Sequence, residues 1–287
     1  MKIRITLILC FSLLGSSFFA QKNAHTFYPE IGIMGGVSYY IGDINPYRHF
    51  GSEMAFGYAG VYRANITRRH VIRVQASKFK VQAHDNQNKD ASLVNRNLHF
   101  RSDITEFAIL LEINFHSFRI GDKYEVLTPY VFGGVAQFTM DPEAEIDGSW
   151  FELQTLHTEG QTIGGNEGEY KRSQFALPFG VGVKYAFAER LALSLEWGMR
   201  KTSTDYLDDV SGFYGDPGEI RESSGELGAA LSDRSLETVG PNGTNNGVYR
   251  GNPDNNDWYI YSGLMLSVRL GKNYTSCWRG DKSAKKY

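Results

Sequence analysis

The sequence predicts an all-β protein, an eight-stranded antiparallel up-and-down transmembrane β-barrel with long extracellular loops. Three observations predict it. Segments of about ten residues place apolar side chains on one face and small or charged ones on the other, with a period of two. The connections between these segments alternate between short and long. Beyond the N-terminal segment no apolar run of about 18 residues occurs, so no spanning helix is predicted.

The clearest strands form a hairpin over residues 173–200. Every second residue from Phe175 to Phe187 is apolar, and the row continues after the short connection 188–190. The residues between are small or charged, as at Lys184 and Glu196. Because the unbroken face is hydrocarbon and aromatic, we expect it to contact lipid while the mixed face points into the barrel.

The other strands follow the same pattern along the chain. They are expected at 31–42, 55–66, 71–81, 103–115, 130–138 and 258–270. Only the third raises a difficulty, because Lys78 and Lys80 would face lipid, which costs about 2–4 kcal/mol at mid-bilayer. Either the membrane ends near Ala76 or a bulge changes the facing there.

The connections indicate how the barrel sits in the outer membrane. The polar segments 43–53, 82–100, 141–172 and 201–257 are long, whereas 67–70 and 188–190 are short and 116–127 is intermediate. Short turns of such barrels face the periplasm, so both termini are expected there. A soluble eight-stranded lipocalin-like barrel or sandwich is the alternative, since its strands also alternate.

Residues 1–20 have the anatomy of a secretory signal peptide, with a basic start, an apolar run and cleavage expected after Ala20. The barrel is then assigned to residues 21–271 and a periplasmic tail to 272–287. Removal of the signal peptide leaves Cys277 as the single cysteine, which excludes an internal disulfide and a thiolate metal cluster.

The long loops and the C-terminal tail carry opposite net charges. Segments 203–257 and 141–172 carry net charges of −8 and −6, and they are expected to be solvated loops. The tail carries +4, and the mature chain carries −4, which does not favour nucleic acid. An acidic periplasmic partner is a sharper hypothesis for the tail. Its candidate contact residues are Lys272, Arg279, Lys282, Lys285 and Lys286.

Charged residues on the inward face predict a filled interior. Eight strands enclose only enough room for their own side chains, so no solute-sized channel is expected. Unpaired charges there would be costly, so salt-bridged layers are expected in place of an ion path. The predicted network comprises Arg63, Arg73, Glu106, Glu112, Lys184, Glu196, Arg200 and Arg269.

No pattern in the sequence singles out an active site. Polar residues that could serve a rim enzyme are His84, His99, Ser102, Asp103, Asp205, Asp208 and Asp209. Their spacing matches no known constellation, the histidines form no metal-ligand pair, and 204–209 lacks the ligand alternation of a calcium loop. We therefore assign no catalytic, cofactor-binding or metal residue and predict no cofactor.

Four stretches resemble the PorG-like outer-membrane barrels of Bacteroidota. They are YYIGDINP at 39–46, FRSD at 100–103, LTPYVFGG at 127–134, and EWGMRKT at 196–202 leading into TDYLDDV at 204–210. The resemblance covers about residues 27–271. It implies an outer-membrane component of the type IX secretion system that associates with the periplasmic ring of PorK and PorN, and it supplies no catalytic residues.

These observations favour a non-enzymatic structural or anchoring component of type IX secretion whose periplasmic face contacts the ring. Two alternatives stay open. One is an outer-membrane lipid or peptide hydrolase at the barrel rim, and the other is a surface-binding or adhesin barrel.

Overall fold

The computed structural model describes residues 27–51, 53–161 and 168–271. The predicted signal peptide, Cys277 and the five basic contact residues of the tail lie outside the described residues. Eight long strands are β1 (Tyr28–Ile41), β2 (Ala55–Asn65), β3 (His70–His84), β4 (His99–Asn114), β5 (Leu127–Thr139), β8 (Ser173–Ala186), β9 (Leu191–Thr202) and β10 (Trp258–Arg269).

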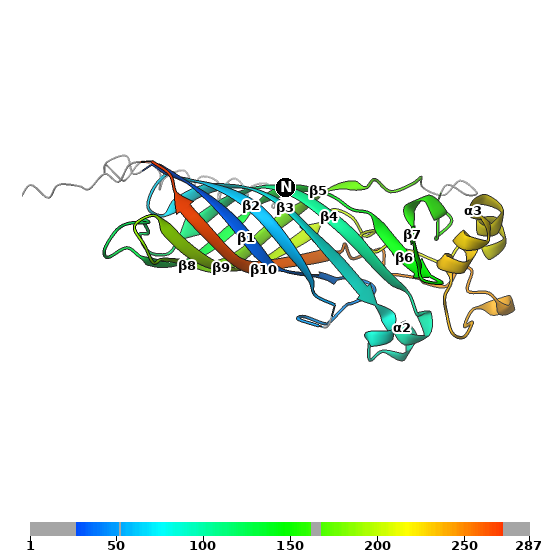
Figure 1. Ribbon diagram of the computed structural model, residues 1–287. Coiled ribbons are helices and arrows are strands. Elements are labelled where there is room, and N and C mark those ends of the chain that lie inside the picture. The colour runs from blue at the N-terminus through cyan, green and yellow to red at the C-terminus, as the bar shows by residue number, and fades with distance from the viewer. Residues whose placement is uncertain (1–26, 52, 162–167, 272–287) are drawn as a thin grey trace, which may run out of the picture.

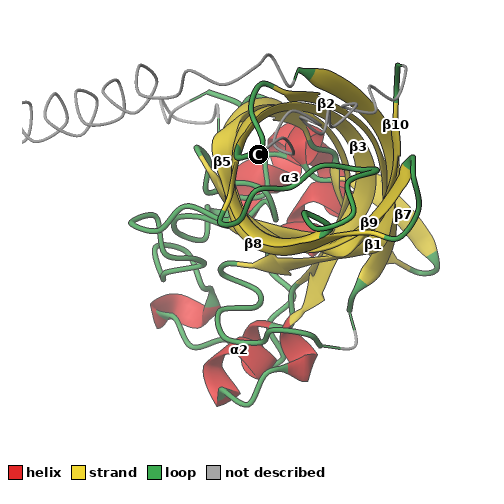
Figure 2. Ribbon diagram, turned by 90° about the vertical axis from the view of Figure 1, so that its left-hand side faces the viewer, coloured by secondary structure: helices red, strands yellow, loops and turns green. Residues whose placement is uncertain are grey.

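These eight strands close into a barrel. Each pairs antiparallel with its neighbour in this series, and β10 pairs with β1 to complete the ring. Viewed along the barrel, the strands form a continuous circle (Figure 2). Closure leaves the eight strands without a free edge, and it confirms the fold class predicted from the sequence.

The two faces of the wall have the chemistry that the alternation predicted. Outward side chains such as Ile33, Phe175 and Leu195 are 70%, 64% and 60% exposed, whereas inward Arg73 and Glu112 are fully buried. A charged interior inside an apolar outer surface is the arrangement of an outer-membrane barrel, because lipid solvates the outside. A water-soluble barrel would need the opposite arrangement.

The pairing of strand β3 shows which way Lys78 and Lys80 face. Its register with β4 runs without interruption from His70 to His84, so no bulge occurs in this pairing. Lys80 stays on the outer face and pairs with Asp103 at 3.4 Å. The strand therefore keeps its facing past Ala76, so a bulge in this pairing does not turn the two lysines inward, and a membrane boundary near Ala76 stays a prediction.

The long connections gather at one end, which we call the loop end, and they contain structure that the sequence analysis treated as loop (Figure 1). The segment predicted as connection 141–172 contains the hairpin of β6 (Pro142–Ile146) and β7 (Ser149–Glu152) followed by η2 (Gln154–Leu156). Helix α2 (Ala91–Arg96) and η1 (Asp85–Gln87) lie between β3 and β4. Helix α3 (Pro217–Ser232) and η3 (Pro241–Gly243) lie between β9 and β10.

Local chemistry explains why α3 forms inside a segment rich in glycine and serine. Asp216 caps it by accepting hydrogen bonds from the N–H groups of Gly218 and Glu219, and Pro217 occupies the first turn. Its apolar residues Ile220 and Leu231 are buried among the loops at this end of the barrel. Among the described residues, no helix has both the length and the apolar character needed to cross a membrane.

The opposite end, the turn end, is closed by the connection between β4 and β5. Phe118 and Ile120 are buried there and pack with Ala186 and Ala192. The guanidinium of Arg269 donates a hydrogen bond to the carbonyl of Ile120 at 2.8 Å. The barrel mouth at this end is therefore occupied by side chains.

Candidate functional site

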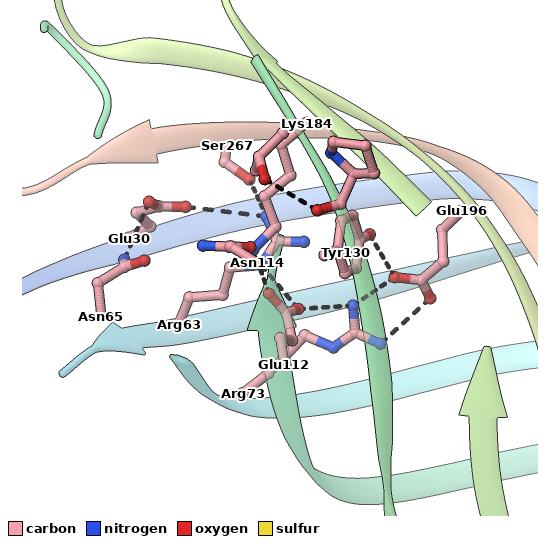
Figure 3. Close-up of polar contacts among 12 residues, drawn as sticks. Glu30, Arg63, Asn65, Arg73, Glu112, Asn114, Tyr130, Lys184, Glu196 and Ser267 are labelled. Carbon is pink, nitrogen blue, oxygen red and sulfur yellow. Dashed lines mark hydrogen bonds and ion pairs between the residues drawn. The ribbon is translucent and has the colours of Figure 1, made fainter. Parts of the chain in front are cut away.

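The barrel interior holds an ion-pair network centred on Glu112 of β4 (Figure 3). Its carboxylate oxygens accept hydrogen bonds from Arg63 at 3.0 Å and from the ammonium group of Lys184, and they form an ion pair with Arg73 at 2.9 Å. These four side chains come from β2, β3, β4 and β8, so the network links opposite walls of the barrel. Each is at most 1% exposed.

The network continues through Arg73 to Glu196 on β9. One guanidinium nitrogen of Arg73 donates to Glu196 Oε1 at 3.1 Å, and the hydroxyl of Tyr130 donates to Oε2 at 2.8 Å. The Arg73 guanidinium also lies 4.6 Å from the ring centroid of Phe132. Aromatic faces thus supply part of the environment that water would otherwise give these charges.

A second layer is built around Glu106. Arg200 donates to its Oε2 at 3.1 Å, Tyr259 donates to the same oxygen at 2.8 Å, and Ser77 donates to Oε1 at 3.1 Å. Arg200 also donates to the carbonyl of Tyr261. Every group around this carboxylate is therefore a donor, as a buried anion requires.

One predicted member, Arg269 of β10, lies at the end of the network directly opposite a partner that was not predicted, Glu30 of β1. Arg269 stands at the turn end, where it donates to a carbonyl and lies 4.9 Å from the ring centroid of Tyr28. Glu30, which is 2% exposed, pairs with Arg63 at 3.8 Å and accepts from Asn65 at 2.9 Å. The period-two pattern could have found Glu30, since it shares the inward face of β1 with Met34.

The chemistry of this interior is structural. Large buried side chains fill the lumen, including Tyr130, Phe138, Tyr259 and Tyr261 besides the charged groups. Its carboxylates pair with cations and accept hydrogen bonds from phenols of the barrel's own strands. These buried side chains therefore plug the lumen.

A second cluster lies at the loop end, where Tyr40 meets two aspartates from the long segment between β9 and β10. The Tyr40 hydroxyl lies 2.5 Å from Asp208 Oδ2 and 2.7 Å from Asp257 Oδ1. All three side chains are at most 1% exposed. Because a phenol has one proton to donate, the second contact requires a proton on one of the carboxyl groups.

This Tyr40 cluster depends on a close approach by the backbone. A Cβ at Gly42 would lie 2.0 Å from Asp257 Oδ1 and 2.0 Å from the Tyr40 hydroxyl oxygen, so no larger residue fits. Backbone N–H groups complete the cluster, since Leu207 donates to Asp257 at 2.9 Å and Val210 donates to Asp208 at 3.0 Å. The acidic segment is thereby fastened to the end of β1.

Burial alters the ionisation of these loop acids. It raises the pKa of Asp205 to about 7, and neither carboxylate oxygen of Asp205 has a hydrogen-bond partner among the described residues. It raises the pKa of Asp209 to about 6, against the opposing charge of Arg250. The pKa values of Asp208 and Asp257 are raised well above the usual range, also chiefly by burial. The prediction that this acidic segment is simply solvated is wrong for these four residues, because packing against the barrel removes them from water.

Most of the polar residues considered for a rim enzyme have structural partners, whereas the carboxylate of Asp205 has none among the described residues. His99 accepts the N–H of Glu145 through Nε2 at 2.9 Å, and its ring stacks on that of His84. Ser102 is buried, and its hydroxyl accepts the N–H of Asp141. Asp103 pairs with Lys80 on the outer face. These contacts hold the fold together and include no nucleophile paired with a base. Within the described part of the chain, no group of three or more His, Cys, Asp or Glu side chains is arranged to hold a metal ion.

Comparisons with known proteins place the chain in a family. The model of the family described as "Domain of unknown function (DUF6089)" matches residues 5–216. A comparison with curated proteins finds no match. The family description assigns no activity.

Solved structures with a similar fold include three outer-membrane or surface proteins. The attachment invasion locus protein Ail of Yersinia pestis is 10% identical, with a TM-score of 0.39, over 85% of this chain and 99% of that one. The N-terminal barrel of Pseudomonas aeruginosa OprF is 12% identical, with a TM-score of 0.35, over 85% and 100%. Neisserial surface protein A is 9% identical, with a TM-score of 0.37, over 85% and 97%.

Proposed function

Since the chain belongs to the DUF6089 family and folds as an outer-membrane barrel, we propose that it is a non-enzymatic anchoring component of the type IX protein secretion system. The observation that carries the proposal is the filled interior. Glu112 and Glu106 organise buried charges across the whole lumen, which leaves the wall and the two ends as working surfaces. The link to the type IX secretion system comes from the resemblance of four sequence stretches to PorG-like barrels.

In this proposal the turn end faces the periplasm and contacts a ring of PorK-like and PorN-like proteins. The chemistry of the turn end supports an acidic partner. The three turns 67–70, 116–127 and 188–190 carry five basic and three acidic residues, a net charge of +2. A protein that brought carboxylates to this rim would complement this charge. The tail residues Lys272, Arg279, Lys282, Lys285 and Lys286 would add positive charge on the same side.

The test is a deletion strain assayed for export of type IX cargo and complemented with either the full chain or a chain ending at residue 271. We expect the deletion to abolish export and the shortened chain to insert normally while losing co-purification with ring proteins. Normal export in the deletion strain would refute the secretion role. Retained co-purification would remove the tail, but not the rim, from the interface.

A further inference from the structure

The loop end carries a groove that neither the ion-pair network nor the Tyr40 cluster uses. It has a volume of about 660 Å³, within the range of ligand sites. Helix α2 and the preceding Asp90 form one wall, and Pro46 and Tyr47 form another. The third wall comes from the segment before β10, including Tyr249. Segments far apart in the sequence therefore meet at this groove.

The groove is formed without a ligand, because its floor is tied together by Arg96. The guanidinium donates to Asp85 at 2.7 and 2.8 Å, to the carbonyl of Asp43 at 2.9 Å and to the carbonyl of Arg250 at 2.6 Å. Asn95 adds a reciprocal pair of hydrogen bonds with the backbone of Glu237. Because the site is already formed, little conformational entropy is lost when it binds a ligand.

The charges at the groove favour a cation. Its two arginines, Arg96 and Arg250, are 8% and 3% exposed. Arg96 is neutralised by Asp85, and Arg250 pairs with Glu159 at 3.1 Å. The carboxylates of the lining, Asp43 and Asp90, keep more exposure. An approaching ligand therefore meets the carboxylates of Asp43 and Asp90, while both arginines are buried and paired.

Aromatic rings border the same groove. Tyr47 and Tyr249 are 85% and 67% exposed, so both rings are accessible to a ligand. The ring of Tyr249 packs on that of Phe213 with centroids 4.4 Å apart, and a backbone bridge joins the two residues. The Tyr249 ring is thus held in place, and the face of such a ring attracts ammonium and guanidinium groups.

From this combination we propose that the loop groove binds basic side chains, lysine or arginine, of an extracellular peptide. The tyrosine rings provide cation–π contact, and the carboxylates of Asp43 and Asp90 accept hydrogen bonds from the cation. The groove's volume of about 660 Å³ is large enough for a lysine or arginine side chain and the adjoining peptide backbone. This inference does not depend on the secretion role, which concerns the opposite end of the barrel.

The experiment measures binding of a fluorescein-labelled Gly/Ser peptide containing two arginines to the full-length protein in detergent micelles. Burial raises the pKa of Asp43, so the measurement is made at pH 8 to keep its carboxylate charged. The same peptide with citrulline in place of arginine and a neutral oligosaccharide are the ligand controls. We expect the arginine peptide alone to bind, and its affinity to fall at 500 mM salt.

Variants locate the site. Tyr47→Ala and Tyr249→Ala should each weaken binding about two- to fivefold, the range for exposed cation–π pairs. Asp43→Asn should weaken it further while the amide oxygen still accepts the N–H of Asn252, the bond that holds this loop. Tyr124→Ala is the matched control, since Tyr124 is 91% exposed at the turn end. The proposal is overturned if the arginine peptide does not bind, if the citrulline peptide or the oligosaccharide binds equally well, or if Tyr47→Ala and Tyr124→Ala behave alike.

Discussion

Replacing Glu112 with glutamine tests whether the interior network stabilises the barrel. The substitution conserves volume but removes the charge that faces Arg63, Arg73 and Lys184. Arg73 keeps Glu196, and Arg63 keeps Glu30 at the longer distance of 3.8 Å. Among the described residues, Lys184 has no second carboxylate within ion-pair distance. Leaving a buried charge unpaired costs about 3–5 kcal/mol.

The assay is urea unfolding in micelles, followed by tryptophan fluorescence and by the shift in gel mobility on heating. Glu125→Gln is the matched control, because it removes the same charge from a pair with Arg68 whose side chains are 25% and 39% exposed. That pair should contribute no more than about 1 kcal/mol. Adding Lys184→Met to Glu112→Gln should recover part of the loss, since it removes the unpaired cation. If Glu112→Gln costs no more than Glu125→Gln, the reasoning about a stabilising plug is wrong.

Three further predictions concern the loops and the wall. Tyr40→Phe removes the hydroxyl shared by Asp208 and Asp257, so we expect the loop end to lose about 1–3 kcal/mol of stability. Proteolysis within 203–257 should become faster while the barrel stays folded. Unchanged cleavage would contradict this prediction. Asp205 and Asp209 have folded-state pKa values of about 7 and 6, above the unfolded value of about 3.9. The folded loops therefore bind extra protons, and their stability should fall as pH rises from about 4 through 7. Limited proteolysis at pH 5 and pH 8 checks this, and Asp205→Asn should make the cleavage rate depend less on pH. Gly134→Ala would place a Cβ 2.1 Å from the carbonyl oxygen of Ile109 and should impair folding, whereas Gly60→Ala, with no atom within 4 Å, should be neutral in the same gel-mobility assay.

What the sequence by itself determined is the facing of the strands. Because side chains of a strand alternate strictly, periodicity alone assigns the rows beginning at Phe175 and Leu191 to the outside and Lys184 and Glu196 to the inside. Counting such segments was enough to predict an eight-stranded barrel. The same reasoning missed α2, α3 and the β6–β7 hairpin, because short elements in polar loops are stabilised by caps and by burial against distant segments.

Only the tertiary structure decided which charges meet. Arg73 and Glu196 are 123 positions apart, and Tyr40 and Asp257 are 217 apart, so no local pattern relates them. The first contact follows from closure of the barrel, which brings inward positions of the non-adjacent strands β3 and β9 face to face. The second follows from the packing of the segment before β10 against the end of β1. The same closure places Arg269 opposite Glu30 at the turn end, where its guanidinium donates to the carbonyl of Ile120. Periodicity specifies the direction of a side chain, whereas its partner is specified by strand register and loop packing.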